Sequence, residues 1–214
     1  MSNPHIGIYI FFLISLAILG YLAHQLPYFP GDIAVSLWLQ KIDLSFFNPV
    51  MQAVSYISSL IPVIVIVILV AGGLLLSRKK PEAIFLVSLT SLTALANWLL
   101  KLLIGRPRPD SELIQILGES SGFSFPSGHT AYAVVFYGFI FYLVPRLTKQ
   151  AAGRWALQPI LILLVILTGA SRIYLGAHWL SDTLASLLLG GLLLATTIAL
   201  HHNYAKGNQR RLGG

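Results

Sequence analysis

Long apolar runs without a single charged side chain constrain this sequence more than any other feature. A helix needs about 20 apolar residues to cross the ~30 Å hydrocarbon core of a bilayer. Only 10% of the 214 residues are charged and 56% are hydrophobic, whereas a soluble domain carries roughly 25% charged residues. The sequence therefore predicts an all-α, polytopic membrane protein and excludes a disordered chain.

Six apolar runs, three of which carry one charged residue near one end, are long enough to be transmembrane helices. They cover approximately residues 6–26, 50–76, 83–104, 128–145, 158–175 and 179–200. The segment before the first run, 1–5, has no Lys or Arg, so we expect that run to be a retained helix rather than a signal peptide. We expect one domain over residues 1–214, with flexible ends at about 1–5 and 203–214.

The basic residues predict the orientation. Nine Lys and Arg residues but one acidic residue fall on the side of the two termini, and five basic and six acidic residues fall on the other side. Cytoplasmic loops carry the excess of Lys and Arg. We therefore expect a multi-pass protein of the plasma (inner) membrane with both termini in the cytoplasm. This asymmetry explains the net charge of +7, and no nucleic-acid partner is expected.

Between the first two runs, residues 32–44 predict a short helix lying in the outer membrane interface. Its polar residues recur at helical spacing and form a thin stripe: Asp32, Ser36, Gln40 and Asp43. Asp32 follows Pro30-Gly31 and suits an N-cap, and Trp38 suits headgroup depth. The helix either borders the path of a substrate from the membrane or is a structural lid.

Three polar segments flank the apolar runs on the outer side. In the first, Lys101 and Arg108 are seven residues apart in the sequence, which is two helical turns if the helix persists, so both could reach one point. The alternative is a lysine that extends to the membrane edge and arginines that contact lipid headgroups.

The second polar segment opens the fourth apolar run with Phe125-Pro126-Ser127-Gly128-His129. We expect Ser127 to cap the helix and the first amides to stay unpaired, which makes a helix N-terminus an anion site. Ordinary capping beside a polar histidine is the alternative.

The third polar segment contains Arg172, His178 and Asp182. His178 and Asp182 are spaced i and i+4, so on a helix the carboxylate can bond one imidazole nitrogen and leave the other free. Arg172 in the membrane edge needs a partner or a function. The alternative is a buried histidine–aspartate pair with a purely structural role.

The predicted topology places all three polar segments on one membrane face. Two histidines, one carboxylate, at least three cations and a helix N-terminus then form a receptor for a multiply charged anion, most simply phosphate. A metal site is the competing interpretation. However, Lys101, Arg108 and Arg172 would repel a divalent cation, so we expect no metal and no cofactor.

These residues resemble the three-part signature of the type 2 phosphatidic acid phosphatase superfamily. The pattern is Lys101-x6-Arg108-Pro109, then Pro126-Ser127-Gly128-His129, then Ser171-Arg172-x5-His178-x3-Asp182. All three parts are complete, and the small six-span form is similar to bacterial lipid phosphatases that act on phosphatidylglycerophosphate and undecaprenyl diphosphate. The spacing selects Arg108 and leaves Arg106 as an accessory residue.

The resemblance implies a metal-independent phosphatase with a phosphohistidine intermediate. His178, oriented by Asp182, would attack phosphorus, and His129 would protonate the leaving oxygen and then activate water. Five residues would hold the phosphate oxygens: Lys101, Arg108, Ser127, Gly128 and Arg172.

The substrate implied is a lipid phosphate mono- or diphosphate ester, such as a polyprenyl diphosphate, phosphatidylglycerophosphate or phosphatidate, cleaved at the extracytoplasmic face. A lipid phosphotransferase with the same histidine and a non-enzymatic anion transporter are the alternatives. The sequence predicts no oligomeric state.

Overall fold

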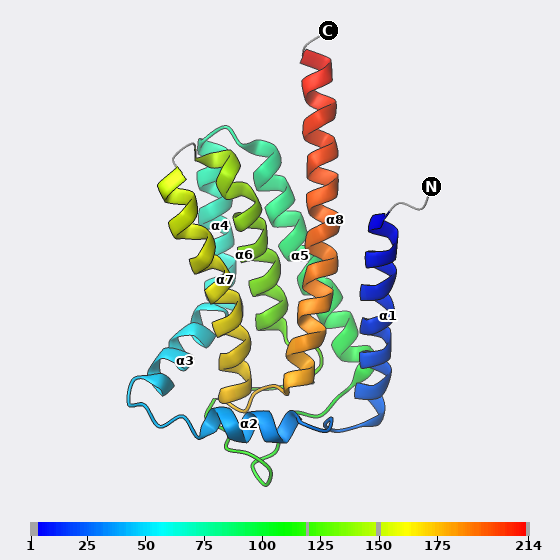
Figure 1. Ribbon diagram of the computed structural model, residues 1–214, viewed down its shortest axis with the longest axis vertical. Coiled ribbons are helices and arrows are strands. Elements are labelled where there is room, and N and C mark those ends of the chain that lie inside the picture. Colours follow the sequence, from blue (N-terminus) through cyan, green and yellow to red (C-terminus); the bar gives the residue numbers. More distant parts are fainter. Residues whose placement is uncertain (1–3, 119, 149–150, 213–214) are drawn as a thin grey trace.

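The computed structural model describes residues 4–118, 120–148 and 151–212, and these are all-α. Eight helices occur within that part of the chain (Figure 1): α1 (Pro4–Gln25), α2 (Asp32–Gln40), α3 (Phe47–Ile57), α4 (Leu60–Leu76), α5 (Lys80–Ile104), α6 (Gly128–Leu147), α7 (Ala151–Tyr174) and α8 (Leu180–Leu212). The predicted fold class is thereby confirmed.

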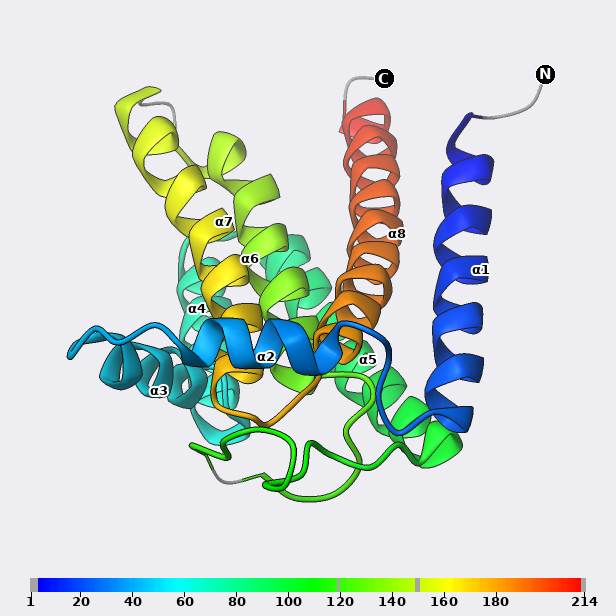
Figure 2. The same cartoon turned by 60° about the horizontal axis from the view of Figure 1, so that its bottom comes forward.

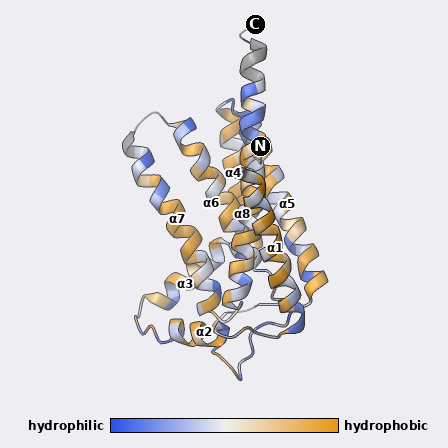
Figure 3. Cartoon of the chain, turned by 45° about the vertical axis from the view of Figure 1, so that its right-hand side comes forward, coloured by the Kyte–Doolittle hydropathy of each residue, from blue (hydrophilic) through white to orange (hydrophobic). Residues whose placement is uncertain are grey.

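Five of the helices, α1, α5, α6, α7 and α8, are long and apolar enough to cross a membrane. They run roughly along the long axis of the molecule (Figure 1), and their hydrophobic residues follow them along most of their length (Figure 3). The chain is therefore an integral membrane protein with five or six spans, depending on how α3 and α4 are counted.

The prediction of one helix over 50–76 is wrong, because α3 and α4 are separate helices bent by 61° at their junction. Pro62 explains the break. A proline lacks the N–H that would bond the carbonyl four residues earlier, here that of Ser58, and its ring clashes with that carbonyl. Ser59 is accordingly extended, with ψ of 165°, and α4 starts again at Leu60.

Two other helices exceed their predicted bounds. α7 already begins at Ala151, with Pro159 inside it, and α8 continues to Leu212. Residues 203–212, predicted as a flexible end, are thus helical. Residues 1–3 and 213–214 of the predicted ends lie outside the described residues.

The core lies where α6 packs against α5, α7 and α8. Half of the apolar stretch of α6 is buried inside the protein, against 11% for α1 at the edge of the bundle. Lipid tails are as apolar as leucine, so close van der Waals packing holds such helices together. In α8, Gly190 permits this packing, since a Cβ there would lie 2.8 Å from the Cβ of Val134 on α6.

Helix α2 crosses one end of the bundle, beside the loop that follows α5 (Figure 2). Its polar stripe faces the protein, because Asp32 and Ser36 are buried and Gln40 donates to the carbonyls of Gln115 and Tyr174. Trp38 on the other side is 65% exposed. The short helix is confirmed, but it ends at Gln40, so that Asp43 lies beyond it and is exposed.

The prediction that Asp32 caps α2 is also wrong. The N-cap is Gly31, whose φ of 95° only glycine adopts readily. Asp32 is the first helical residue, and its carboxylate points into the end of the bundle, where it bonds Arg106 and Ser181. The capping rule failed because a buried partner far away in the sequence uses this carboxylate.

Candidate active site

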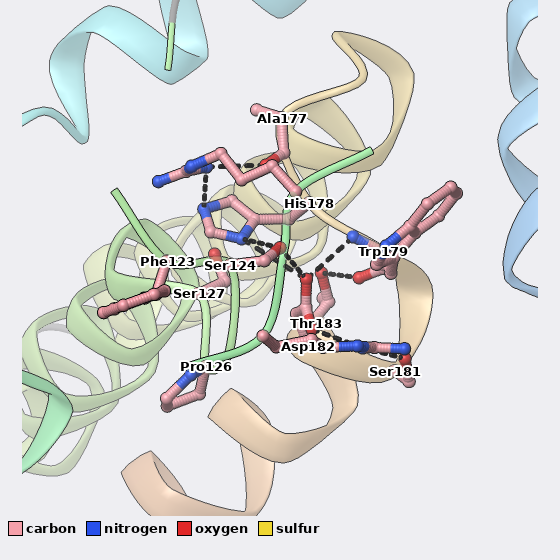
Figure 4. Close-up of polar contacts among 12 residues, drawn as sticks. Phe123, Ser124, Pro126, Ser127, Ala177, His178, Trp179, Ser181, Asp182 and Thr183 are labelled. Carbon is pink, nitrogen blue, oxygen red and sulfur yellow. Dashed lines mark hydrogen bonds and ion pairs between the residues drawn. The ribbon is translucent and has the colours of Figure 1, made fainter. Parts of the chain in front are cut away.

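All three predicted polar segments meet at the end of the bundle that α2 crosses. The first runs from the last turn of α5 into the loop after it, the second opens α6, and the third joins α7 to α8. Figure 4 shows His178, Ser124 and Asp182 pointing toward one another at this junction. The described ends of α1 and α8, near the two termini, lie at the opposite end of the molecule (Figure 1).

His178 is 2% exposed and lies just before α8 rather than on it. A turn at Gly176, with φ of 68°, directs the chain back toward the bundle, and the His178 N–H donates to the Arg172 carbonyl. Asp182, in the first turn of α8, accepts from the Trp179 N–H at 2.9 Å. The i, i+4 spacing therefore brings the two side chains together through a turn and not through a helical face.

The two nitrogens of His178 have different partners. Nδ1 lies 3.5 Å from Asp182 Oδ2, and Nε2 lies 3.2 Å from the Arg108 guanidinium. A guanidinium only donates, so Nε2 accepts and Nδ1 carries the proton. Burial lowers the pKa of His178 to about 3, although Asp182 opposes this shift. The imidazole is therefore neutral at pH 7, with the lone pair of Nε2 on the side of Arg108.

Backbone carbonyls of one loop hold the two cations of the first polar segment. Arg108 donates to the carbonyls of Ser121 and Gly122, and Lys101 Nζ donates to that of Phe123 at 2.5 Å. Because α5 ends at Ile104, the loop and not a continuous helix brings Arg108 to the site.

The N-terminus of α6 has the predicted cap. Ser127 is buried, and its Oγ accepts from the Thr130 N–H at 3.5 Å. Gly128 and His129 form the first turn, whose N–H groups have no partner within the helix. The last of the predicted site residues, Arg172, is 5% exposed at the end of α7 and donates to Ser55 Oγ of α3.

Sequence reasoning missed two residues around Asp182. Ser124 is completely buried, donates to Asp182 Oδ2 and lies 3.4 Å from His178 Nδ1. Arg106, expected to be an accessory, is 1% exposed and donates to Asp182 Oδ1 at 2.5 Å. The sequence signals were slight: Ser124 is two residues before Pro126, and Arg106 is the first arginine of a repeated Arg-Pro pair.

Two openings reach the site from different sides. An apolar cavity of about 530 Å³ lies between α4, α5 and α6, and Gly128 and His129 are among the residues that line it. A more polar depression of about 960 Å³ lies beside Arg108 and is lined by residues of the loop after α5, including Ser120 and Ser121. α2 contributes none of the described residues that line the apolar cavity, so it does not border that opening.

Cations predominate around His178. No group of three or more His, Cys, Asp or Glu side chains among the described residues is placed to hold a metal ion. The fixed positive charges and the α6 N-terminus instead suit the oxygens of a phosphate group.

A neutral histidine with cations beside it lies at one end of a bundle of membrane-length helices, and this arrangement suits a phosphate group at a membrane surface. The sequence matches the PAP2 superfamily over residues 81–206. The chain therefore belongs to the PAP2 superfamily, whose members are phosphatases.

Individual relatives agree with this assignment. The chain is 30% identical to phosphatidylglycerophosphatase B of Bacillus subtilis over 194 residues, which is 90% of this chain and 92% of the relative. The crystal structure of a transmembrane PAP2 type phosphatidylglycerolphosphate phosphatase from the same organism superposes with a TM-score of 0.80 at 26% identity, over 91% of this chain and 96% of that one. Aquifex aeolicus LpxE shares the fold, with a TM-score of 0.63 at 21% identity over 78% of this chain and 94% of that one.

Proposed function

We propose that this phosphatase hydrolyses a phosphate mono- or diphosphate ester of a lipid at the extracytoplasmic face, through a phosphohistidine on His178. The placement of His178 carries the proposal. Its Nε2 carries no proton and accepts from Arg108, while its Nδ1 faces Asp182. When Arg108 turns to a phosphate oxygen, the Nε2 lone pair becomes available for attack, as a histidine nucleophile requires.

In the first step, Nε2 of His178 attacks phosphorus, the N–P bond forms, and the bond from phosphorus to the lipid oxygen breaks. His129 donates a proton to that leaving oxygen. Asp182 stabilises the positive charge that develops on the imidazole. In the second step, His129 takes a proton from water, the resulting hydroxide attacks phosphorus, and the N–P bond breaks to release phosphate.

Phosphoryl transfer needs mainly positioning and neutralisation of negative charge. The groups that supply both are Lys101, Arg108, Ser127, the Gly128 amide and Arg172. Their contacts with backbone carbonyls and with Ser55 hold the cations in place before the substrate arrives.

The apolar cavity between α4, α5 and α6 supports a lipid substrate. Because His129 lines the cavity, a lipid tail in it could bring the leaving oxygen to the group that protonates it. The named activity of the Bacillus subtilis relative makes phosphatidylglycerophosphate the first substrate to test, followed by a polyprenyl diphosphate and phosphatidate.

The proposed orientation follows from charge. Nine of the 14 basic residues fall on the side of the termini, which the positive-inside rule assigns to the cytoplasm. The site is at the other end of the helices, and so on the extracytoplasmic face of the plasma (inner) membrane.

The test is phosphate release by the purified protein in mixed micelles of each lipid. We expect turnover of at least one of phosphatidylglycerophosphate, undecaprenyl diphosphate, phosphatidate and a sphingoid phosphate, together with labelled phosphate on His178 after an alkaline quench, because a phosphohistidine is stable in base and labile in acid. His202→Ala, at an exposed histidine near the far end of α8, is the matched control. Folded protein that releases no phosphate from any of these lipids, or that is still labelled as His178→Ala, contradicts the proposal.

A further inference from the structure

Asp182 belongs to a row of buried charges that leads away from His178. Arg106 donates from NH1 to Asp182 Oδ1 at 2.5 Å and from NH2 to Asp32 Oδ2 at 3.1 Å. None of the three side chains is more than 2% exposed. A guanidinium between two carboxylates therefore links the interfacial helix α2 to the first turn of α8.

Arg106 is fixed from several directions. Ser181 Oγ accepts from Arg106 NH1 at 2.7 Å and donates to Asp32 Oδ2 at 2.7 Å. The Ser181 N–H donates to Asp32 Oδ1 at 2.9 Å. The guanidinium carbon also lies 4.7 Å from the centre of the Phe29 ring. Since a guanidinium presents its donors in a rigid plane, two partners at its ends determine its orientation.

The two oxygens of Asp182 have separate partners. Oδ1 is held by Arg106, whereas Oδ2 faces Ser124, the Trp179 N–H and His178 Nδ1. A carboxylate can rotate about the bond that joins it to Cβ. With Oδ1 bound on one side, Oδ2 stays on the side of His178.

We propose that Arg106 and Asp32 are positioning residues for the nucleophile, and that α2 therefore acts on the reaction through Asp182. Asp32 orients Arg106, Arg106 orients Asp182, and Asp182 orients His178 and stabilises its developing charge. This inference rests on the proposed function, in which His178 is the nucleophile.

The proposal predicts a loss of kcat with little change in KM. Arg106 and Asp32 bond each other, Ser181 and Asp182, and none of the residues proposed to bind phosphate, so we expect anion binding to remain intact. Loss of a partner that orients a functional side chain costs roughly 10–100-fold in activity. We expect Arg106→Gln to lower kcat on the order of 100-fold and Asp32→Asn about tenfold. Inhibition by vanadate, which reports the anion site, should change by less than about twofold.

A double-mutant cycle separates positioning from a merely structural role. Residues that act as a unit have strongly non-additive effects. If Asp32 acts through Asp182, adding Asp32→Asn to Asp182→Asn should leave kcat within about twofold of Asp182→Asn alone. If Asp32 only stabilises the fold, the two losses should multiply.

Two further variants complete the experiment. Arg106→Lys keeps the charge but cannot span both carboxylates, and it should restore part of the kcat that Arg106→Gln loses. Asp43→Asn makes the same charge change as Asp32→Asn at an exposed position just beyond α2, and it should keep the native kcat. Should Asp32→Asn or Arg106→Gln fail to give folded protein, Ser181→Ala replaces it in the cycle.

Native kcat in Asp32→Asn, or independent multiplication of the two losses, overturns the inference. Failure of the proposed function is distinguishable, because it would show in the native enzyme as the absence of label on His178. Failure of the inference alone leaves that label in place while the cycle is additive.

Discussion

Two buried histidines stand at opposite ends of the bundle. His178 precedes α8 and is 2% exposed, and His201 lies far along α8 and is 4% exposed. Nδ1 of His178 faces the Asp182 carboxylate, whereas Nδ1 of His201 lies 2.9 Å from the hydroxyl of Tyr142. The rings of Phe85 and Phe139 surround His201, at 5.1 Å and 6.1 Å between ring centres.

Burial and a hydrogen bond to Nδ1 are therefore common to both histidines. What differs is the groups that directly contact the ring: a carboxylate and a guanidinium lie 3.5 Å and 3.2 Å from the two nitrogens of His178, whereas a phenol and aromatic rings contact His201. We therefore expect paired charges, rather than burial alone, to prepare His178 for the proposed reaction with phosphate.

The largest expected effect tests this contrast directly. His178→Ala should lower kcat by at least about 10⁴-fold, because the nucleophile of a two-step mechanism is lost. His201→Phe should keep kcat within about threefold, since the ring packing is preserved. The measurement is steady-state phosphate release with label trapping. A comparable loss of kcat in both variants would contradict the distinction drawn between the two histidines.

The second prediction concerns the partner of each histidine. Asp182→Asn should lower kcat by roughly 10³-fold, because the imidazole loses both its orientation and the charge that stabilises it. Tyr142→Phe removes the corresponding bond at the other end and should cost about 1 kcal/mol of stability with unchanged kcat. Kinetics and thermal unfolding in detergent measure the two outcomes. A native rate in Asp182→Asn would contradict the role given to the carboxylate.

The third prediction concerns the turn that positions His178. Gly176→Ala should destabilise the protein by roughly 2–4 kcal/mol and lower kcat, because φ is 68° and a Cβ would overlap the Gln115 carbonyl. The control is Gly207→Ala near the end of α8, where a Cβ would meet nothing within 4 Å. That variant should be neutral or slightly stabilising, as thermal unfolding will show.

The smallest effect is a dependence of stability on pH. The pKa of His178 is about 3 in the folded protein, against about 6.5 in an unfolded chain. As pH falls below about 6.5, the unfolded chain takes up a proton that the folded protein does not. The stability due to neutral His178 is therefore complete above pH 6.5 and declines toward pH 3.

At pH 5 this decline amounts to about 2 kcal/mol. His178→Asn should consequently lose less stability between pH 7 and pH 5 than the native protein does. Other histidines titrate in both proteins, so the difference between the two unfolding curves isolates His178. Identical slopes would mean that His178 is not buried as a neutral imidazole.

Much of this arrangement could be predicted from local sequence. Apolar length alone predicts five of the helices, and the three polar segments, with the family resemblance they carry, predict His129, His178 and Asp182 as site residues. Each of these features depends mainly on residues that are close together in the sequence, so a local sequence pattern is enough to predict it. Even the cap at Ser127 follows from the residues beside it.

What the sequence could not predict depends on distant partners. The role of Arg106 comes from Asp32 and Asp182, which are 74 and 76 residues away. Asp32 could not be recognised as the buried partner of Arg106, because the residues before it also suit a helix N-cap. The break between α3 and α4 was missed for a different reason. Pro62 is a local signal for a helix break, but the continuous apolar sequence on both sides of it favoured a single helix.

Helix α8 extends well past the other helices (Figure 1). Its 33 residues correspond to about 50 Å at 1.5 Å per residue, and the hydrocarbon core takes up only ~30 Å of that length. The final turns therefore extend beyond a hydrocarbon core of that thickness, at the opposite end of the molecule from the candidate active site (Figure 1). A fluorophore attached to them would be held off the lipid surface without obstructing turnover, and would serve to measure how the protein tilts in a bilayer.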